Sequence, residues 1–239
     1  TDSEWEQFFN EYIANKNDDI VAKTQKIQDD YIQVLKRDTG ESQNIKLIDK
    51  DNIHNNFVQV INQYVEEGGN YDTRYDVSIL VNGLPLVHIE LKRRGANHLK
   101  EQEAGGRNKS KKTSNSFEFS SFWADSNNKV ITDLLDFTKT FFSKHTLLSI
   151  LTKYCVFTSE KMLMVMRPYQ IAATERIIQR INVANNYKFY GSIKGGGYIW
   201  HTTGSGKTLT SFKTAQLASR LPYIDKVLFV VDRKDLDYQ

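Results

Sequence analysis

The sequence predicts an α/β protein divided into two domains, at residues 1–155 and 156–239. Two changes of residue pattern indicate this fold class. From Val77 to Leu91, apolar and polar residues alternate around the turn signal Asn82-Gly83, which is typical of a β-hairpin. Beyond Cys155, short apolar segments alternate with helical patterns, and the order strand, helix, strand is typical of a parallel α/β sheet.

The spacing of apolar residues predicts the other elements. The first helix begins with a capping box formed by Ser3 and Glu6 and extends to residue 13. Two more helices are expected over residues 20–34 and 53–65, the second ending before Gly68 and Gly69. We expect a loop over 95–115, one or two helices over 130–151, a short buried strand over 162–166, helices over 170–181 and 206–220, and strands over 198–201 and 227–231.

Composition excludes several classes of protein. The chain is 39% hydrophobic, 12% aromatic and 26% charged, which is typical of a globular protein and not of a disordered one. Cys155 is the single cysteine, which excludes a disulfide framework and cysteine-based zinc sites. Because no apolar run approaches the roughly 20 residues that span a bilayer, we expect a soluble, cytoplasmic protein with no membrane partner.

Charge is unevenly distributed although the net charge is only +3. Residues 1–75 hold eight Lys and Arg against fifteen Asp and Glu, whereas residues 91–112 hold eight Lys and Arg against two Glu. A concentrated basic patch therefore follows an acidic region, and such a patch is suited to a polyanion.

A glycine-rich segment between a predicted strand and a predicted helix is the strongest functional signal. Backbone N–H groups of such a loop, at a helix N-terminus, surround phosphate oxygens. Here Lys207 is placed to reach the β and γ phosphates of a nucleotide and Thr208 to bind Mg²⁺. The strict pattern has a glycine where this chain has His201, and a plain glycine-rich turn with an exposed lysine is the alternative. The predicted phosphate-binding residues are Thr203, Gly204, Ser205, Gly206, Lys207 and Thr208.

Two segments flanking this loop are candidates for nucleotide and DNA contacts. Gln170 precedes the loop by some 35 residues, and a Gln side chain can pair with the N6 and N7 edge of adenine, which would select ATP. Arg233 and Lys234 follow the predicted strand 227–231, where they either touch a DNA backbone or form a solvated strand end.

The predicted hairpin carries a candidate metal site. Asp76 and Glu90 are carboxylates that can hold Mg²⁺, and Lys92 can stabilise charge on a phosphate or position the attacking water. A regular two-residue turn would pair Asp76 with Ile89 and put the carboxylates on opposite faces. We therefore predict an odd loop, a β-bulge before Glu90, or a bend at Asp76.

The residues around this carboxylate pair have both functional and plain interpretations. Arg93 and Arg94 follow Lys92 at once and are candidate DNA contacts. His88 shares a face with Glu90 and could contact phosphate, although an ordinary hydrogen-bonded histidine is the simpler interpretation. The alternative for the whole motif is an edge strand with surface charges.

Together these segments resemble the restriction (R) subunit of type I restriction-modification enzymes. The segments that carry the resemblance occur in that family's order and span nearly the whole chain: Arg74-Tyr75-Asp76-Val77, Asn82-Gly83-Leu84-Pro85-Leu86-Val87, Ile89-Glu90-Leu91-Lys92, Arg167-Pro168-Tyr169-Gln170, Tyr198-Ile199-Trp200-His201-Thr202-Thr203-Gly204-Ser205-Gly206-Lys207-Thr208 and Val231-Asp232-Arg233-Lys234-Asp235-Leu236. The resemblance implies a mixed-sheet PD-(D/E)xK nuclease core flanked by helices, followed by the first part of a RecA-like parallel α/β motor domain of superfamily 2.

The resemblance also implies activity, cofactors and partners. Such a subunit uses ATP and Mg²⁺ to translocate double-stranded DNA and cleaves it away from the recognition site, together with modification (methyltransferase) and specificity subunits. Asp76, Glu90 and Lys92 match the nuclease motif, Gln170 the adenine motif, and Gly204, Gly206, Lys207 and Thr208 motor motif I.

The chain departs from the family pattern in three places. The family starts earlier than Thr1, and its Gln-x-x-x-Tyr motif and a further core strand have no counterpart after Lys92, which implies a missing stretch near residues 103–110. The later motor motifs also have no counterpart, so we expect ATP binding with little hydrolysis from these residues alone. Two other functions stay open: an ATP-dependent DNA translocase or helicase with an inactive nuclease module, and a non-catalytic ATP-dependent DNA-binding switch.

Overall fold

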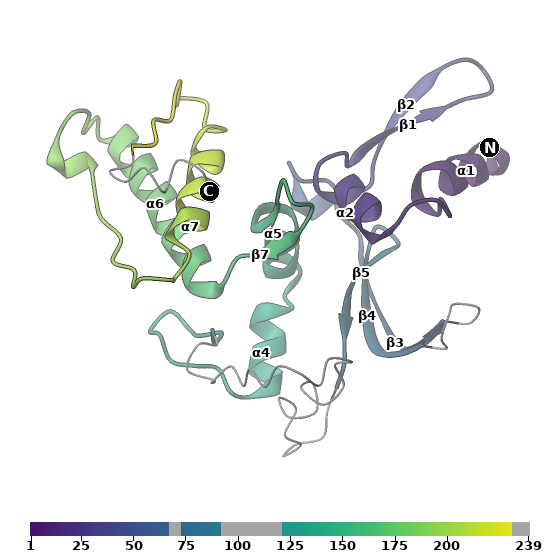
Figure 1. The fold of residues 1–239 in the computed structure, drawn as a ribbon, viewed down its shortest axis with the longest axis horizontal. Helices are drawn as coiled ribbons and strands as arrows, with labels where there is room; N and C mark the ends of the chain where they lie inside the picture. The colour runs from purple at the N-terminus through teal and green to yellow at the C-terminus, as the bar shows by residue number, and fades with distance from the viewer. Residues whose placement is uncertain (67–72, 92–120, 231–239) are drawn as a thin grey trace. The chain divides into compact units, whose positions relative to one another are not determined.

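The computed structural model describes residues 1–66, 73–91 and 121–230. By its internal contacts the chain divides into two compact units. Unit 1 holds Thr1–Ser120 with Ser143–His145, and unit 2 holds Ser121–Phe142 with Thr146–Gln239. The described elements mix helices and strands, so the coarse α/β prediction is confirmed (Figure 1).

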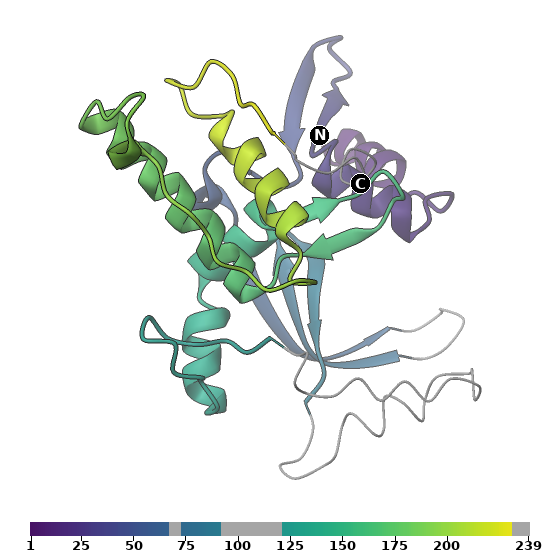
Figure 2. The same ribbon diagram turned by 60° about the vertical axis from the view of Figure 1, so that its left-hand side comes forward.

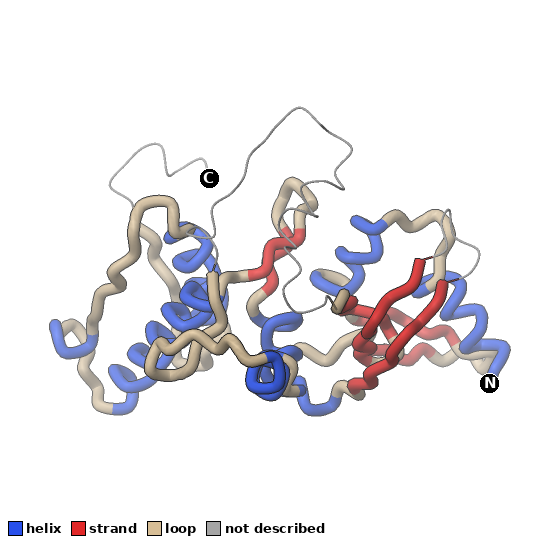
Figure 3. The backbone as a smooth tube through the Cα atoms, turned by 90° about the horizontal axis from the view of Figure 1, so that it is seen from below, coloured by secondary structure: helices blue, strands red, loops and turns tan. Residues whose placement is uncertain are grey.

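Unit 1 combines short helices with two antiparallel sheets (Figure 3). Its helices and helical turns are α1 (Asp2–Phe8), η1 (Phe9–Ile13), α2 (Ile20–Gln28) and η2 (Ile53–Asn55). Its strands are β1 (Ile32–Lys36), β2 (Ser42–Lys46), β3 (Val58–Glu66), β4 (Thr73–Val81) and β5 (Leu84–Ile89). β1 pairs with β2, and β3, β4 and β5 form a three-stranded sheet in chain order.

The predicted N-terminal helix is confirmed, but its capping residues are not. Thr1 rather than Ser3 caps α1, with its hydroxyl accepting the backbone N–H of Glu4 at 3.3 Å. Because the first helical residue is Asp2, the box pairs Thr1 with Glu4 and leaves Ser3 and Glu6 inside the helix.

The helix predicted over residues 53–65 is wrong, and so is the end of the helix predicted over 20–34. Residues 58–66 form strand β3, and the second helix ends at Gln28, before strand β1. Val60, Ile61, Tyr64 and Val65 of β3 are all exposed apolar residues. Since this strand carries apolar residues at adjacent positions, it matches a helical stripe as well as an alternating one, and pairing with β4 decides its conformation.

The described residues of unit 2 form one strand pair and a set of helices. The described elements are α4 (Leu134–Phe141), β6 (Cys155–Phe157), β7 (Leu163–Val165), α6 (Pro168–Asn186), η4 (Ile193–Gly195) and α7 (Lys207–Ala218). Helix α5 (Lys144–Lys153) begins with two residues that are grouped with unit 1 and continues in unit 2. Three predictions of helix are therefore confirmed: over 130–151 as α4 and α5, over 170–181 as α6, and over 206–220 as α7.

The parallel sheet predicted for this part is not present among the described residues. Residues 198–201 and 224–230 form no strand, and β7 pairs antiparallel with β6. Strand β7 is also largely exposed rather than buried, with Leu163 at 42% and Val165 at 55% exposure. A strand exists through hydrogen bonds to a neighbour, and in the described part of unit 2 the apolar segments ending at Trp200 and Val230 have no such neighbour.

Helices α6 and α7 pack against each other and position the glycine-rich loop (Figure 2). Small buried residues line the contact and allow close approach: Ala173 and Thr174 on α6, Thr210, Thr214 and Ala218 on α7. The hydroxyl of Thr214 lies 3.4 Å from that of Thr174. Lys213, only 6% exposed, donates from α7 to the carbonyl oxygen of Cys155 at 3.1 Å and so ties this helix to β6.

Candidate functional site

The β4–β5 hairpin contains the bulge that the carboxylate site requires. Asn82 and Gly83 form its two-residue turn, with φ of 52° and 83°, as a type I′ turn demands. Val81 pairs with Leu84 and Leu80 with Pro85, but Ile79 pairs with Val87, so Leu86 is an extra residue on β5. The prediction of a bulge before Glu90 is confirmed.

The bulge changes which β5 residues face the start of β4. Beyond it Ser78 pairs with His88 and Val77 with Ile89, and extending this register by one position would set Asp76 opposite Glu90, just past the end of β5. The carboxylate of Asp76 accepts the backbone N–H of Leu91 at 2.7 Å, which fixes Asp76 at this end of β5. Glu90 is exposed. Two opposed carboxylates with solvent access match Mg²⁺, which binds through one or two carboxylates and retains waters.

Several predicted site residues lie outside the described residues. These are Lys92, Arg93 and Arg94 beside the hairpin, Arg233 and Lys234 after the segment ending at Val230, and the stretch near residues 103–110. Within the described ranges, no group of three or more His, Cys, Asp or Glu residues forms a metal-binding cluster. The carboxylate pair therefore carries the candidate metal site here.

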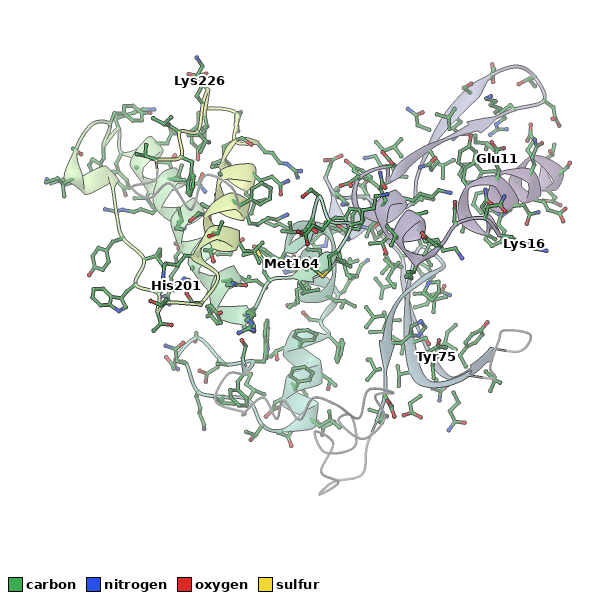
Figure 4. The ribbon with its side chains drawn as sticks, in the orientation of Figure 1. Glu11, Lys16, Tyr75, Met164, His201 and Lys226 are labelled. Carbon is green, nitrogen blue, oxygen red and sulfur yellow. The ribbon has the colours of Figure 1, made fainter. Side chains whose placement is uncertain are left out.

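His88 is held by two neighbours on β4. Its Nδ1 atom lies 2.9 Å from the hydroxyl of Ser78, which is only 2% exposed. The ring of Tyr75 stacks on the imidazole at 4.0 Å between ring centroids, and Figure 4 shows Tyr75 on this strand. His88 thus has the hydrogen-bonded environment of the simpler interpretation. Ser78 and Tyr75 were missed because each looks like an ordinary strand residue in the sequence.

A network of side-chain amides, with Asn56 buried and Asn82 exposed, anchors the turn of this hairpin. The side chain of Asn82 donates to Leu47 O at 3.1 Å and accepts the N–H of Phe57 at 2.8 Å. It also donates at 2.9 Å to the side chain of Asn56, which is 1% exposed and pairs in turn with both backbone groups of Asp49. Because every amide group in this network has a partner, the turn is held firmly to the preceding segment.

Asp49, at the far end of the network, is a strongly stabilised carboxylate. Hydrogen bonds from the backbone N–H of Asn52 and from the side chain of Asn55, together with Lys46, lower the pKa of Asp49 to about 2. The carboxylate is therefore ionised at any physiological pH.

The glycine-rich loop forms a tight turn directly before α7. Gly204 and Gly206 both have positive φ, of 77° and 75°, which residues with a side chain rarely adopt. The hydroxyl of Ser205 donates to Thr202 O at 2.7 Å and closes the turn. Lys207 begins α7, and its amino group reaches back to Thr202 O at 3.0 Å. Thr203 is exposed in the turn and Thr208 in the first turn of α7.

Gln170 lies against this loop, and its amide is hydrogen-bonded within the protein. Its side-chain oxygen accepts the N–H of Arg167 at 2.9 Å, and its side-chain nitrogen donates to Ser205 O at 3.0 Å. The side chain is 4% exposed. An adenine contact through this amide stays a prediction, and it requires exchange of these hydrogen bonds.

Tyr169 is a loop contact that the sequence did not indicate. Its hydroxyl donates to Ser205 O at 2.8 Å, 36 residues along the chain. Its ring meets His201 edge to face at 5.6 Å between centroids, and Figure 4 shows His201 on the segment ahead of α7. A single residue beside Gln170 has no periodicity that marks such a long-range contact.

Two family models match the chain along its length. The model of the type I restriction enzyme R protein N terminus matches residues 1–137, and the SWI2/SNF2 ATPase model matches residues 169–239. Since the first covers more than half of the chain, the protein belongs to the type I restriction enzyme R protein family. The resemblance noted in the sequence is confirmed.

Individual relatives agree with this membership. The chain is 44% identical over 211 residues to the type I restriction enzyme EcoprrI endonuclease subunit of Escherichia coli, covering 75% of this chain and 67% of that protein. It is 38% identical over 232 residues to the type I restriction enzyme SsaAORF53P endonuclease subunit of Staphylococcus saprophyticus, and 36% identical over 234 residues to the SauMSSORF170P endonuclease subunit of Staphylococcus aureus. Each of the last two matches covers 86% of this chain and 24% of the relative, so the chain spans about a quarter of their length.

None of the helices within the described ranges is both long enough and apolar enough to cross a bilayer.

Proposed function

We propose that this chain supplies the nuclease and nucleotide-binding parts of a type I restriction subunit, which uses ATP to translocate double-stranded DNA and cleaves it with Mg²⁺ away from the recognition site. The observation that supports the proposal is the bulged hairpin, because extending its register from the Val77–Ile89 pair by one position would set Asp76 opposite Glu90. In this assignment residues 1–155 are the endonuclease domain and residues 156–239 begin the RecA-like motor domain. The match of residues 169–239 to an ATPase model supports ATP as the nucleotide.

In this proposal the carboxylates of Asp76 and Glu90 bind the Mg²⁺ ion of the nuclease site. A Mg²⁺ ion bound there would neutralise the scissile phosphate and favour deprotonation of water. Asp76 is held by the N–H of Leu91, so its carboxylate is oriented before any ion binds. Lys92 is two residues beyond Glu90. We assign to its ammonium group the stabilisation of the negative charge that develops on the phosphate.

In this proposal the glycine-rich loop binds the phosphates of the nucleotide. Lys207 exchanges its own-chain carbonyl contacts for the β and γ phosphates, and Thr208 is positioned as a Mg²⁺ ligand in the first turn of α7. Thr203, Gly204, Ser205 and Gly206 supply backbone N–H groups, and Gln170 contacts adenine. DNA contacts are assigned to Arg93 and Arg94 in the nuclease part and to Arg233 and Lys234 in the motor part.

The proposal extends to partners, since relatives are named as endonuclease subunits of type I restriction enzymes. We assign modification and specificity subunits as protein partners, double-stranded DNA as the substrate, and the cytoplasm as the location. The specificity subunit, not this chain, would read the DNA target.

The test is cleavage of circular DNA carrying a recognition site by the complete assembly, with ATP and Mg²⁺. We expect Asp76→Asn and Glu90→Gln to reduce cleavage at least about 100-fold while ATP turnover persists, because the metal-supported charge stabilisation is lost. Glu41→Gln, on the exposed β1–β2 turn, is the matched control and should cleave normally.

Other outcomes identify the alternative functions. ATP-driven translocation by the unaltered assembly without cleavage would identify a translocase with an inactive nuclease module. ATP-dependent DNA binding without phosphate release would identify a non-catalytic switch.

A further inference from the structure

Two consecutive residues of α6 donate hydrogen bonds to the carbonyl oxygen of Ser205 in the glycine-rich loop. The hydroxyl of Tyr169 lies 2.8 Å from this oxygen and the side-chain nitrogen of Gln170 lies 3.0 Å from it. A carbonyl oxygen accepts two hydrogen bonds, so both donors are satisfied at once. The phosphate loop is thus fixed by side chains on α6 as well as by its own turn.

Fixing this carbonyl also fixes the N–H group on the other side of the same peptide. The peptide plane between Ser205 and Gly206 is rigid, and in a trans peptide its C=O and N–H point in opposite directions. Since the carbonyl of Ser205 points to its donors on α6, the N–H of Gly206 points away from them. Such N–H groups are the phosphate donors of a glycine-rich loop.

The two donors differ in what they can do when a nucleotide binds. An amide that reads adenine needs both its oxygen and its nitrogen for the base, and in Gln170 these atoms are bonded to Arg167 and Ser205. Tyr169 is not assigned a contact with the base, and its ring packs edge to face against His201. Tyr169 can therefore hold Ser205 whether or not Gln170 turns to a base.

We propose that Tyr169 is a positioning residue of the nucleotide site, whose hydroxyl orients the N–H of Gly206 toward phosphate by holding the carbonyl of Ser205. The inference rests on the proposed nucleotide-binding function and deepens it. Tyr169 acts on the phosphates alone, in contrast to the base contact assigned to Gln170.

The experiment measures the affinity of the full chain for three probes with Mg²⁺: ATP, GTP and inorganic tripolyphosphate, which has no base. Tyr169→Phe removes only the hydroxyl, and we expect all three affinities to fall by the same factor of about five to ten, the equivalent of one hydrogen bond. Gln170→Ala should weaken ATP more than tripolyphosphate. Tyr187→Phe, at an exposed tyrosine on the far end of α6, is the matched control and should bind all three normally.

A rescue separates positioning from a general loss of structure. Tyr169→4-aminophenylalanine restores a donor at the same place and should restore affinity, and the melting temperature without ligand should stay within about 2 °C of the unaltered chain for both variants. His201→Ala, which removes the ring support but not the hydroxyl, should give a smaller loss.

Each contrary result has a distinct meaning. Unchanged affinities in Tyr169→Phe, or a loss confined to ATP, would overturn the role of Tyr169 while leaving nucleotide binding intact. Absence of binding of every probe to the unaltered chain would instead overturn the proposed function itself.

Discussion

Gly204 and Gly206 of the glycine-rich loop share a backbone conformation but differ in their surroundings. A Cβ atom on Gly204 would meet open space, whereas one on Gly206 would collide with the side-chain nitrogen of Gln170. Gly204→Ala therefore costs only the strain of positive φ, about 1 kcal/mol. Gly206→Ala adds displacement of a buried, hydrogen-bonded amide, for a total of about 2–3 kcal/mol. Denaturant unfolding of both variants measures the difference, and equal losses would contradict the contact between Gln170 and the loop.

The carboxylate of Asp49 makes a pH-dependent contribution to stability. Its pKa of about 2 in the folded chain is below the ordinary value of about 4, so its hydrogen bonds contribute fully above about pH 4 and are lost as the pH falls through about 2. We expect Asp49→Asn to lower the free energy of unfolding at pH 7 by about 1 kcal/mol. The free energy of unfolding should then decrease less steeply in this variant as the pH falls. Denaturant titrations between about pH 7 and 2 measure this. Asp51→Asn, with a side chain 73% exposed, is the control and should retain the decline.

Residue-level prediction succeeded where the signal is local. The tight turn at Gly204 and Gly206 and the bulge before Glu90 follow from short-range rules about positive φ and strand pairing, while phosphate binding by these glycines stays a prediction. Tyr169 and Ser78 could not be found this way, because their importance comes from contacts with Ser205 and His88 that only the folded chain creates.

At the scale of elements, the register of the β4–β5 hairpin is the feature on which the proposed nuclease function depends. Insertion of one alanine between Val87 and His88 would shift Glu90 by one position and turn it to the face opposite Asp76. We expect DNA cleavage by the complete assembly to fall at least about 100-fold, with far-ultraviolet circular dichroism unchanged. An inserted glycine after Gly40, in the turn between β1 and β2, is the control and should be tolerated. Full cleavage by the first variant would show that opposition of the two carboxylates is not needed.

Element types were predictable where the chain itself supplies the hydrogen bonds. Helices α4 to α7 satisfy their own backbone, so periodicity sufficed to predict them. The sequence predicts a helix where β3 forms, because its adjacent apolar residues fit both periods. It predicts a strand over residues 198–201, although strand formation depends on a neighbour elsewhere in the fold.

For the whole molecule, the division into two units predicts that nucleotide stabilises one part selectively. The phosphate loop and its α6 contacts all lie in unit 2. At a concentration about 100 times its dissociation constant, ATP with Mg²⁺ should stabilise that unit by about 2.7 kcal/mol and raise its melting temperature by several degrees. Calorimetry should show one transition whose melting temperature rises with ATP and one whose melting temperature does not change. A rise in both melting temperatures would contradict selective stabilisation of unit 2.

The segment that leads into the phosphate loop offers an optical reporter. Trp200 is 89% exposed and lies two residues before Thr202, whose carbonyl receives Lys207. An indole in water emits at longer wavelength than one packed in a protein, so Trp200 should dominate the red edge of the emission spectrum. In the proposed function Lys207 exchanges this carbonyl for a nucleotide phosphate, and we expect the emission of Trp200, nearby in the sequence, to shift in wavelength when it does. Fluorescence from this tryptophan would thus follow occupancy of the loop in real time without an attached dye.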